Sequence, residues 1–158
     1  MTVLAERWKY LAETERILSG PPALARIERP EPRGNRVARF VLPLELCQPQ
    51  NRKRAEPVWV GLKRRRSIAA AMWSHSRPWA KPLSGRPQVL CVRFSSNEPD
   101  KYSDWAKEAI DVLMAPTKRK PTGRLNIIVD DSPKHIELHQ WWEFAKPKEG
   151  FVYIEVRT

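Results

Sequence analysis

Apolar side chains recur at near-helical spacing over the first nineteen residues, at Leu4, Trp8, Leu11, Ile17 and Leu18. This pattern predicts a helix over residues 2–19. Gly20-Pro21-Pro22 ends the helix, and the proline-rich stretch 21–35 predicts an irregular linker. We therefore expect residues 1–35 to form an N-terminal helical extension that packs on the main domain or on a partner.

The pattern changes from Arg36 onward. One apolar run predicts a strand that ends between Pro43 and Leu46, and Val89–Phe94 predicts a second strand. Helical spacing over Gly61–Ser76 predicts a helix between them. Its inner side is expected to carry Leu62, Ile68, Ala69, Met72 and Trp73. Lys63–Arg66 are expected to project outward, and their positive charge in the first turn opposes the helix dipole, which indicates an external anion.

Three further segments complete the predicted fold. A helix is expected over Ser103–Met114, with Ser103 as its N-cap. Leu125–Val129 is expected to be a short strand or an extended segment. Alternation in 135–144 and 151–156 predicts two last strands, paired as an antiparallel hairpin. The order of elements predicts an α/β (α+β) fold, a mixed β-sheet with helices packed against it.

Length and composition narrow the classes of protein. The 158 residues fit one domain with an appendage. No apolar run approaches the roughly 20 residues that span a bilayer, and the first residues lack the apolar stretch of a signal peptide. Cys47 and Cys91 do not make a disulfide framework and predict reduced thiols, so we expect a cytoplasmic protein without a membrane partner. Four-cysteine zinc sites and glycine-rich nucleotide loops are excluded by composition.

The net charge of +11 is concentrated in the middle of the chain. Residues 39–98 carry 12 basic and 3 acidic side chains, whereas residues 99–158 carry 10 of each. A concentrated basic region attracts polyanions, of which nucleic acid is the commonest. Two other interpretations stay open: a solvated basic surface without a partner, and a basic structural or RNA-binding protein.

Acidic residues cluster in the last third of the chain. At 100° per residue, Asp104, Lys107 and Asp111 share one polar face of the predicted helix. Asp100 lies in the loop before it, and Asp130-Asp131 lies in a later turn. Converging carboxylates repel one another unless a cation lies between them. Mg²⁺ prefers such oxygen ligands and activates water for attack on a phosphate.

Lys107 would then hold a phosphate or the attacking water. The alternative is purely structural: Asp100 and Asp104 stabilise the start of the helix through its dipole, and Asp130-Asp131 is only a turn.

Residues from about Arg39 to Thr158 resemble the RusA-type Holliday junction resolvases, a family of small endodeoxyribonucleases common in phages and prophages. Leu42-Pro43 and the polar loop with Asn51 match the start of the family pattern. Lys107, Asp111 and Leu113 match its Lys-x-x-x-Asp-x-Leu stretch without gaps. Asp130-Asp131-Ser132 matches the Asp-Asp that follows, and a terminal hairpin completes the pattern. The resemblance implies a RusA-like domain over residues 36–158.

The chain departs from the family at the metal-binding Asp-x-Asp. Aligned without gaps on Lys107, the two aspartates of the family fall on Lys101 and Ser103. With a small insertion, Asp100 takes the first position and Asp104 approximates the second.

The resemblance implies that Asp100, Asp104 and Asp131 bind Mg²⁺ or Mn²⁺, with Lys107 as a catalytic helper. Because neighbouring extended residues point in different directions, only one of Asp130 and Asp131 is expected to coordinate, and the family favours Asp131.

These observations predict a metal-dependent, structure-selective endonuclease that resolves Holliday junctions in DNA recombination and repair. The resemblance implies a homodimer that makes paired nicks in a four-way junction. Catalysis is expected from Asp104, Lys107 and Asp131, and metal binding from Asp100, Asp104, Asp130 and Asp131. DNA contacts are expected from Asn51, Arg52, Lys53, Arg54, Arg64, Arg65, Arg66, Lys118, Arg119 and Lys120. The alternative is a protein of the same fold that binds branched DNA without cutting it.

Overall fold

The computed structural model describes residues 3–20, 29–48, 56–100 and 103–158. The N-terminal helix α1 covers Val3–Ser19 and is followed by strand β1, Arg36–Pro43, and a short 3₁₀ helix, Leu44–Leu46. Helix α3 covers Val58–Trp73, strand β2 Gln88–Ser95 and helix α4 Lys107–Leu113. Strands β3, Glu137–Phe144, and β4, Phe151–Arg157, end the chain. The expected mixed α/β class is confirmed.

The four strands form one sheet in the order β1-β4-β2-β3. β4 runs antiparallel to both β1 and β2, and β3 runs parallel to β2 in the register Val89↔Leu138. The predicted β3–β4 hairpin is therefore wrong, because β2 lies between the two strands. The burial of the strands explains this order: every residue of β2 and all but the last of β4 are buried, whereas β3 is largely half-exposed, as suits an edge strand.

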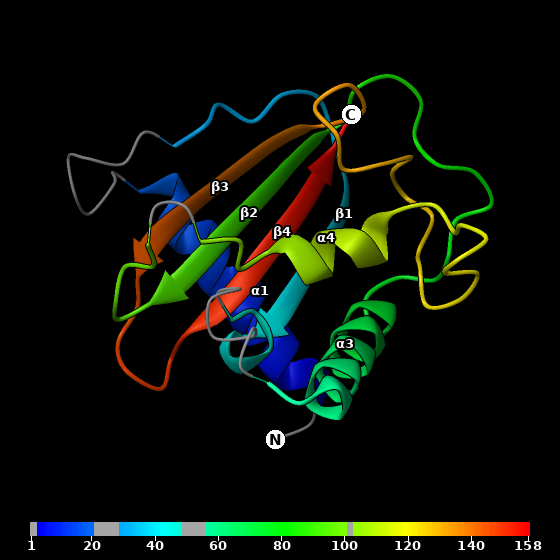
Figure 1. The fold of residues 1–158 in the computed structure, drawn as a ribbon. Helices are drawn as coiled ribbons and strands as arrows, with labels where there is room; N and C mark the ends of the chain where they lie inside the picture. Colours follow the sequence, from blue (N-terminus) through cyan, green and yellow to red (C-terminus); the bar gives the residue numbers. More distant parts are fainter. Residues whose placement is uncertain (1–2, 21–28, 49–55, 101–102) are drawn as a thin grey trace.

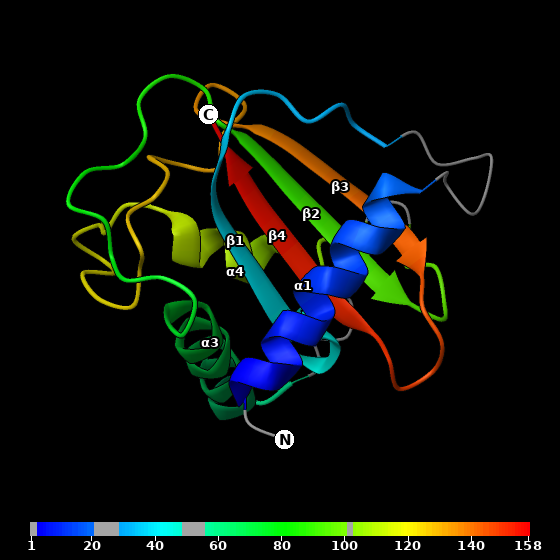
Figure 2. The ribbon, with the colours of Figure 1, turned by 180° about the vertical axis from the view of Figure 1, so that it is seen from behind.

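Helices cover both faces of the sheet (Figure 1). α3 and α4 lie on one face, where Ile68 and Met72 of α3 pack with Ile110 and Leu113 of α4 over the strands. α1 crosses the other face, as Figure 2 shows. Its Leu11 is buried in a second cluster of strand residues, Val41, Val92, Phe94, Phe151 and Tyr153. The N-terminal helix thus shares a core with the sheet.

The two helices that flank the candidate site differ from their predicted extents. α3 begins three residues earlier than expected, and Leu62 and Trp73, predicted to face inward, are 44% and 42% exposed. α4 begins at Lys107 rather than Ser103, so the predicted N-cap is wrong. Ser103 instead closes a turn, because its backbone N–H and its hydroxyl both donate to the backbone oxygen of Asp100.

Within the described ranges, none of the helices combines the length and the apolar character needed to cross a bilayer.

Candidate active site

The segment after α4 folds back along the helix and carries two acidic residues to it. Backbone N–H groups of Leu125 and Ile127 donate to the backbone oxygens of Val112 and Leu113, at 2.7 and 2.8 Å. Leu125, Ile127 and Ile128 are completely buried in the core, which fixes the segment against α4. The segment predicted as a short strand or extended stretch is irregular: Asn126 has a φ of 57°, and one bridge joins Met114 to Ile128. Asp130-Asp131 therefore lies beside the polar face of α4.

Lys107 is the centre of this polar face. Its Nζ donates a 2.8 Å hydrogen bond to Oδ1 of Asp111, one turn later on α4, and another to Oδ2 of Asp131. The sequence placed Lys107 and Asp111 on one helical face, and this contact confirms it. An ammonium group thus lies between two carboxylates that come from different segments.

The electrostatics of the cluster fix the charge of each group at neutral pH. The hydrogen bond from Lys107 lowers the pKa of Asp131 below its ordinary 3.8. Burial opposes the charged form of Lys107, but its hydrogen bonds to Asp111 and Asp131 outweigh burial and raise its pKa above 10.5. Lys107 is therefore protonated and Asp131 ionised across the physiological range, so Lys107 does not act there as a general base.

Asp130 and Asp131 have different partners. The Oδ1 of Asp130 accepts a 2.7 Å hydrogen bond from the backbone N–H of Asp131, whereas the carboxylate of Asp131 faces Lys107. A hydrogen bond with the side chain of Asp130 also lowers the pKa of Asp131, so the two neighbouring carboxyl groups lie close to each other.

The side chains of Asp100 and Asp104 take no part in the described hydrogen bonds of the Lys107 ammonium. Both are exposed, and Asp104 precedes the first residue of α4 instead of lying on its face. Among the residues that the structure describes, no three His, Cys, Asp or Glu side chains come together as a metal-binding group. Asp111 and Asp131 both accept hydrogen bonds from Lys107, so the ammonium group links these two carboxylates.

Arg64 has a structural partner on α4. Its Nε and Nη2 donate to the two carboxylate oxygens of Glu108, both at 3.0 Å, and its Nη1 pairs with Glu56. The side chain is 9% exposed, and the hydrogen bonds to Glu108 raise its pKa above its ordinary range. The prediction that Arg64 projects outward is therefore wrong: a bidentate pair with Glu108 ties α3 to α4.

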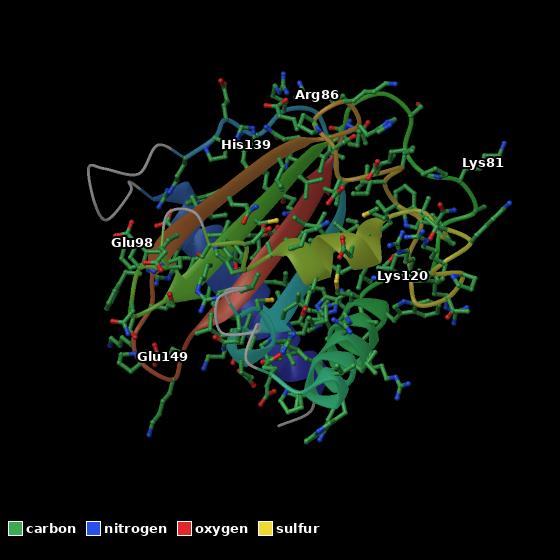
Figure 3. All side chains as sticks on the ribbon, viewed as in Figure 1. Lys81, Arg86, Glu98, Lys120, His139 and Glu149 are labelled. Atoms are coloured by element: carbon green, nitrogen blue, oxygen red, sulfur yellow. The ribbon has the colours of Figure 1, made fainter. Side chains whose placement is uncertain are left out.

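Basic residues line a groove of about 260 Å³ beside the cluster. It runs between α3, α4 and the loop that follows α4. The predicted DNA contacts Arg65, Arg66 and Lys120 line this groove together with Asp111 and Arg124. Figure 3 shows Lys120 on the α4 side of the molecule, far from Glu149 in the β3–β4 turn. The groove thus joins three predicted contacts to one member of the Lys107 cluster.

The other predicted DNA contacts divide into two sets. Lys118 and Arg119 are exposed in the turn closed by mutual backbone hydrogen bonds of 3.1 Å between Thr117 and Lys120. Those in the loop before α3 lie outside the described residues: Asn51, Arg52, Lys53 and Arg54.

Arg124 and Asp111 were not among the predicted site residues. Arg124 donates to the backbone oxygen of Ala115 at 2.9 Å and lines the groove. No local sequence pattern indicated Arg124, because its place in the groove depends on how the segment after α4 folds back along that helix. Asp111 had a signal in the i, i+4 spacing from Lys107, which is the spacing of an ion pair on a helix.

Comparison with known proteins adds no relative: no family model, no curated protein and no solved structure matches the chain.

Proposed function

We propose that the protein is a metal-dependent, structure-selective endodeoxyribonuclease that cuts branched DNA, as the RusA-type Holliday junction resolvases do. One observation carries the proposal: Asp111 both accepts a hydrogen bond from Lys107 and lines the basic groove. Acidic side chains at the wall of a groove lined by basic residues suit metal-assisted cleavage of a phosphodiester in a strongly basic protein.

The groove would hold the sugar–phosphate backbone of a strand. Arg65 and Arg66 line it from α3, while Lys120 and Arg124 line it from the loop after α4. Contacts to phosphates fix the position of DNA without reading its sequence. This chemistry suits an enzyme that selects the shape of a junction.

Lys107 would bind a phosphate oxygen and stabilise the charge that develops during cleavage. It keeps its proton at neutral pH, so it acts as a cation and not as a base. Asp111 positions it through an i, i+4 contact on the rigid helix.

The donor set fits Mg²⁺ or Mn²⁺ through Asp131, with Asp130 next to it. Mg²⁺ keeps several waters and is often held by one or two carboxylates together with substrate phosphates, so a cluster of three acidic residues is not required. When bound, such an ion supplies a water of lowered pKa and neutralises phosphate charge. The lowered pKa of Asp131 keeps this ligand ionised.

Paired nicks in a four-way junction require two sites, so the proposal includes a homodimer. A role in DNA recombination and repair follows from the same substrate.

A second candidate function is binding of branched DNA without cleavage. The observation that favours it is the position of Lys107, whose ammonium already pairs with Asp111 and Asp131, while Asp100 and Asp104 are exposed. A lysine that substitutes for a metal ion would leave the basic groove functional and the chemistry absent.

A nicking assay on a synthetic four-way junction separates the two functions. Wild-type protein with Mg²⁺ or Mn²⁺ is compared with Asp131→Asn, and a linear duplex of the same sequence serves as the second substrate. The endonuclease predicts nicking of the junction that Asp131→Asn abolishes. Junction binding without nicking under either ion supports the second candidate.

Glu149→Gln is the matched control variant. Glu149 is an exposed carboxylate in the turn between β3 and β4, and Figure 3 shows it on the other side of the view from Lys120 of the basic groove. Its loss removes the same charge, so equal nicking by wild type and Glu149→Gln assigns any loss in Asp131→Asn to the site. Equal affinity for junction and linear duplex would contradict both candidates and favour a general basic protein.

A further inference from the structure

A second groove, of about 350 Å³, lies on the outer side of α3. Trp59, Leu62, Lys63, Arg66, Ser67 and Ala70 line it, and none of them is acidic. Trp59 is 67% exposed, an unusual cost for a large apolar ring. The inner side of the helix, with Ile68 and Met72, already fills the core, so Trp59 is not needed there.

This outer groove adjoins the groove beside the Lys107 cluster. Leu62 and Arg66 line both of them, so the two form a continuous path across α3. A strand that lies beside Asp111 and continues over α3 would reach Trp59.

The charge of α3 selects the kind of partner. The helix carries Lys63, Arg64, Arg65 and Arg66 and no acidic residue. Within the described part of the chain, Arg65 and Arg66 form no ion pair, unlike Arg64. A symmetric contact through this face with a second copy would bring like charges together. A polyanion is the complementary partner.

The exposed ring of Trp59 indicates which kind of polyanion binds. Bases in a duplex are stacked on one another, so an exposed indole gains a stacking partner only from an unpaired base. We propose that the outer groove binds single-stranded DNA, with one base stacked on Trp59 and the adjacent phosphates held by Lys63 and Arg66. The inference rests on the proposed function, because the bound strand is the one that passes the Lys107 cluster. Branched DNA offers unpaired bases where its strands diverge.

The test measures the affinity of a fluorescently labelled dT oligonucleotide by anisotropy, without divalent cations so that no cleavage occurs. Trp59→Ala should weaken binding about five- to 150-fold, the range of one lost base–aromatic stack. Trp59→Phe should restore most of the affinity, because any aromatic face stacks. Affinity for a blunt duplex should change less than about twofold, since no unpaired base is present.

Trp8→Ala is the matched control. Trp8 is 61% exposed on α1, which covers the opposite face of the sheet, so its removal should leave dT binding unchanged. Because Trp59 lies outside the core, Trp59→Ala should keep the melting temperature of wild type within a few degrees.

Two results would overturn the inference: equal dT affinity of wild type and Trp59→Ala, or a change of oligomeric state in Trp59→Ala on sedimentation. The second would assign this face to self-association. If the protein binds dT through Trp59 but never nicks a junction, this inference holds and the proposed nuclease function is wrong. If the protein nicks a junction and binds dT independently of Trp59, only this inference is wrong.

Discussion

Lys107 and Asp131, 24 residues apart in the chain, form an ion pair that joins α4 to the segment after Ile128. Their side chains are 35% and 29% exposed, so solvent screens the pair and its contribution to stability is about 1 kcal/mol or less. The proposed function instead assigns the charges of this pair to binding a phosphate and a metal ion.

Replacing Lys107 by Met tests this interpretation. The variant should lose at least about a hundredfold in junction nicking, because a positioned cation no longer meets the phosphate. Its free energy of unfolding should fall by no more than about 1 kcal/mol. Single-turnover nicking and urea denaturation measure the two effects. Lys146→Met, in the exposed β3–β4 turn, should change neither; a Lys107→Met protein that nicks normally would remove Lys107 from the mechanism.

Arg64 should behave in the opposite way, as a structural residue. Arg64→Met removes one partner of two half-buried carboxylates, Glu108 and Glu56, and should destabilise the protein by up to about 3 kcal/mol. Arg66 is exposed, so Arg66→Met should lower the free energy of unfolding by about 0.5 kcal/mol or less. Chemical denaturation of both variants checks this, and equal stabilities would show that the Glu108 contact contributes nothing.

The role of Arg65 and Arg66 in DNA binding is best tested without Arg64, whose loss would disturb the α3–α4 contact. The double variant Arg65→Ala/Arg66→Ala should reduce the slope of log affinity against log salt by up to about 1.8, or about 0.9 per phosphate contact. Lys146→Ala/Lys148→Ala removes the same charge from the exposed β3–β4 turn and should leave the slope nearly unchanged. Equal slopes for both double variants would exclude α3 from the DNA-binding surface.

His75 makes stability depend on pH. Its Nε2 accepts the backbone N–H of Val41 at 3.0 Å, so the proton lies on Nδ1, which faces the backbone oxygen of Ala71 at 2.9 Å. Burial, and then the charge of Arg7, lowers the pKa of His75 below its ordinary 6.5. Below pH 6.5 the unfolded chain therefore binds more protons than the folded protein, and the free energy of unfolding decreases as the pH is lowered.

The expected slope is at most about 1.4 kcal/mol per pH unit for this one group. His75→Gln cannot titrate, so its free energy of unfolding should fall less than that of wild type between pH 7 and pH 5. His135→Gln, whose ring lies in a half-exposed turn, should retain the full dependence. A His75→Gln protein with the wild-type slope would show that another group titrates.

Local patterns predicted the elements well, because they report short-range preferences. The apolar alternation from Arg36 and the buried run around Leu90 gave two strands close to their observed bounds, β1 and β2. The pairing of β3 with β4 failed, since pairing depends on which strands are buried on both faces. A short turn at Lys146–Gly150 favours a hairpin locally, but tertiary burial places β2 between the two strands.

The same distinction applies to the site. The contact of Lys107 with Asp111 follows from helical spacing, and the structure confirms it. The inward packing of Arg64 depends on Glu108, 44 residues away, which no local pattern reveals. The sequence places Asp104 on the helix because Ser103 resembles an N-cap, whereas Trp105 and Ala106 form a turn and α4 begins at Lys107.

The most direct test of the central claim is the single-turnover rate of nicking of a four-way junction in Mn²⁺ by wild type and by Asp131→Asn. The account predicts cleavage by wild type and a rate at least about a hundredfold lower in Asp131→Asn, with junction affinity retained. A wild-type protein that binds the junction tightly and leaves it intact, or an Asp131→Asn protein that cuts as fast as wild type, would contradict it.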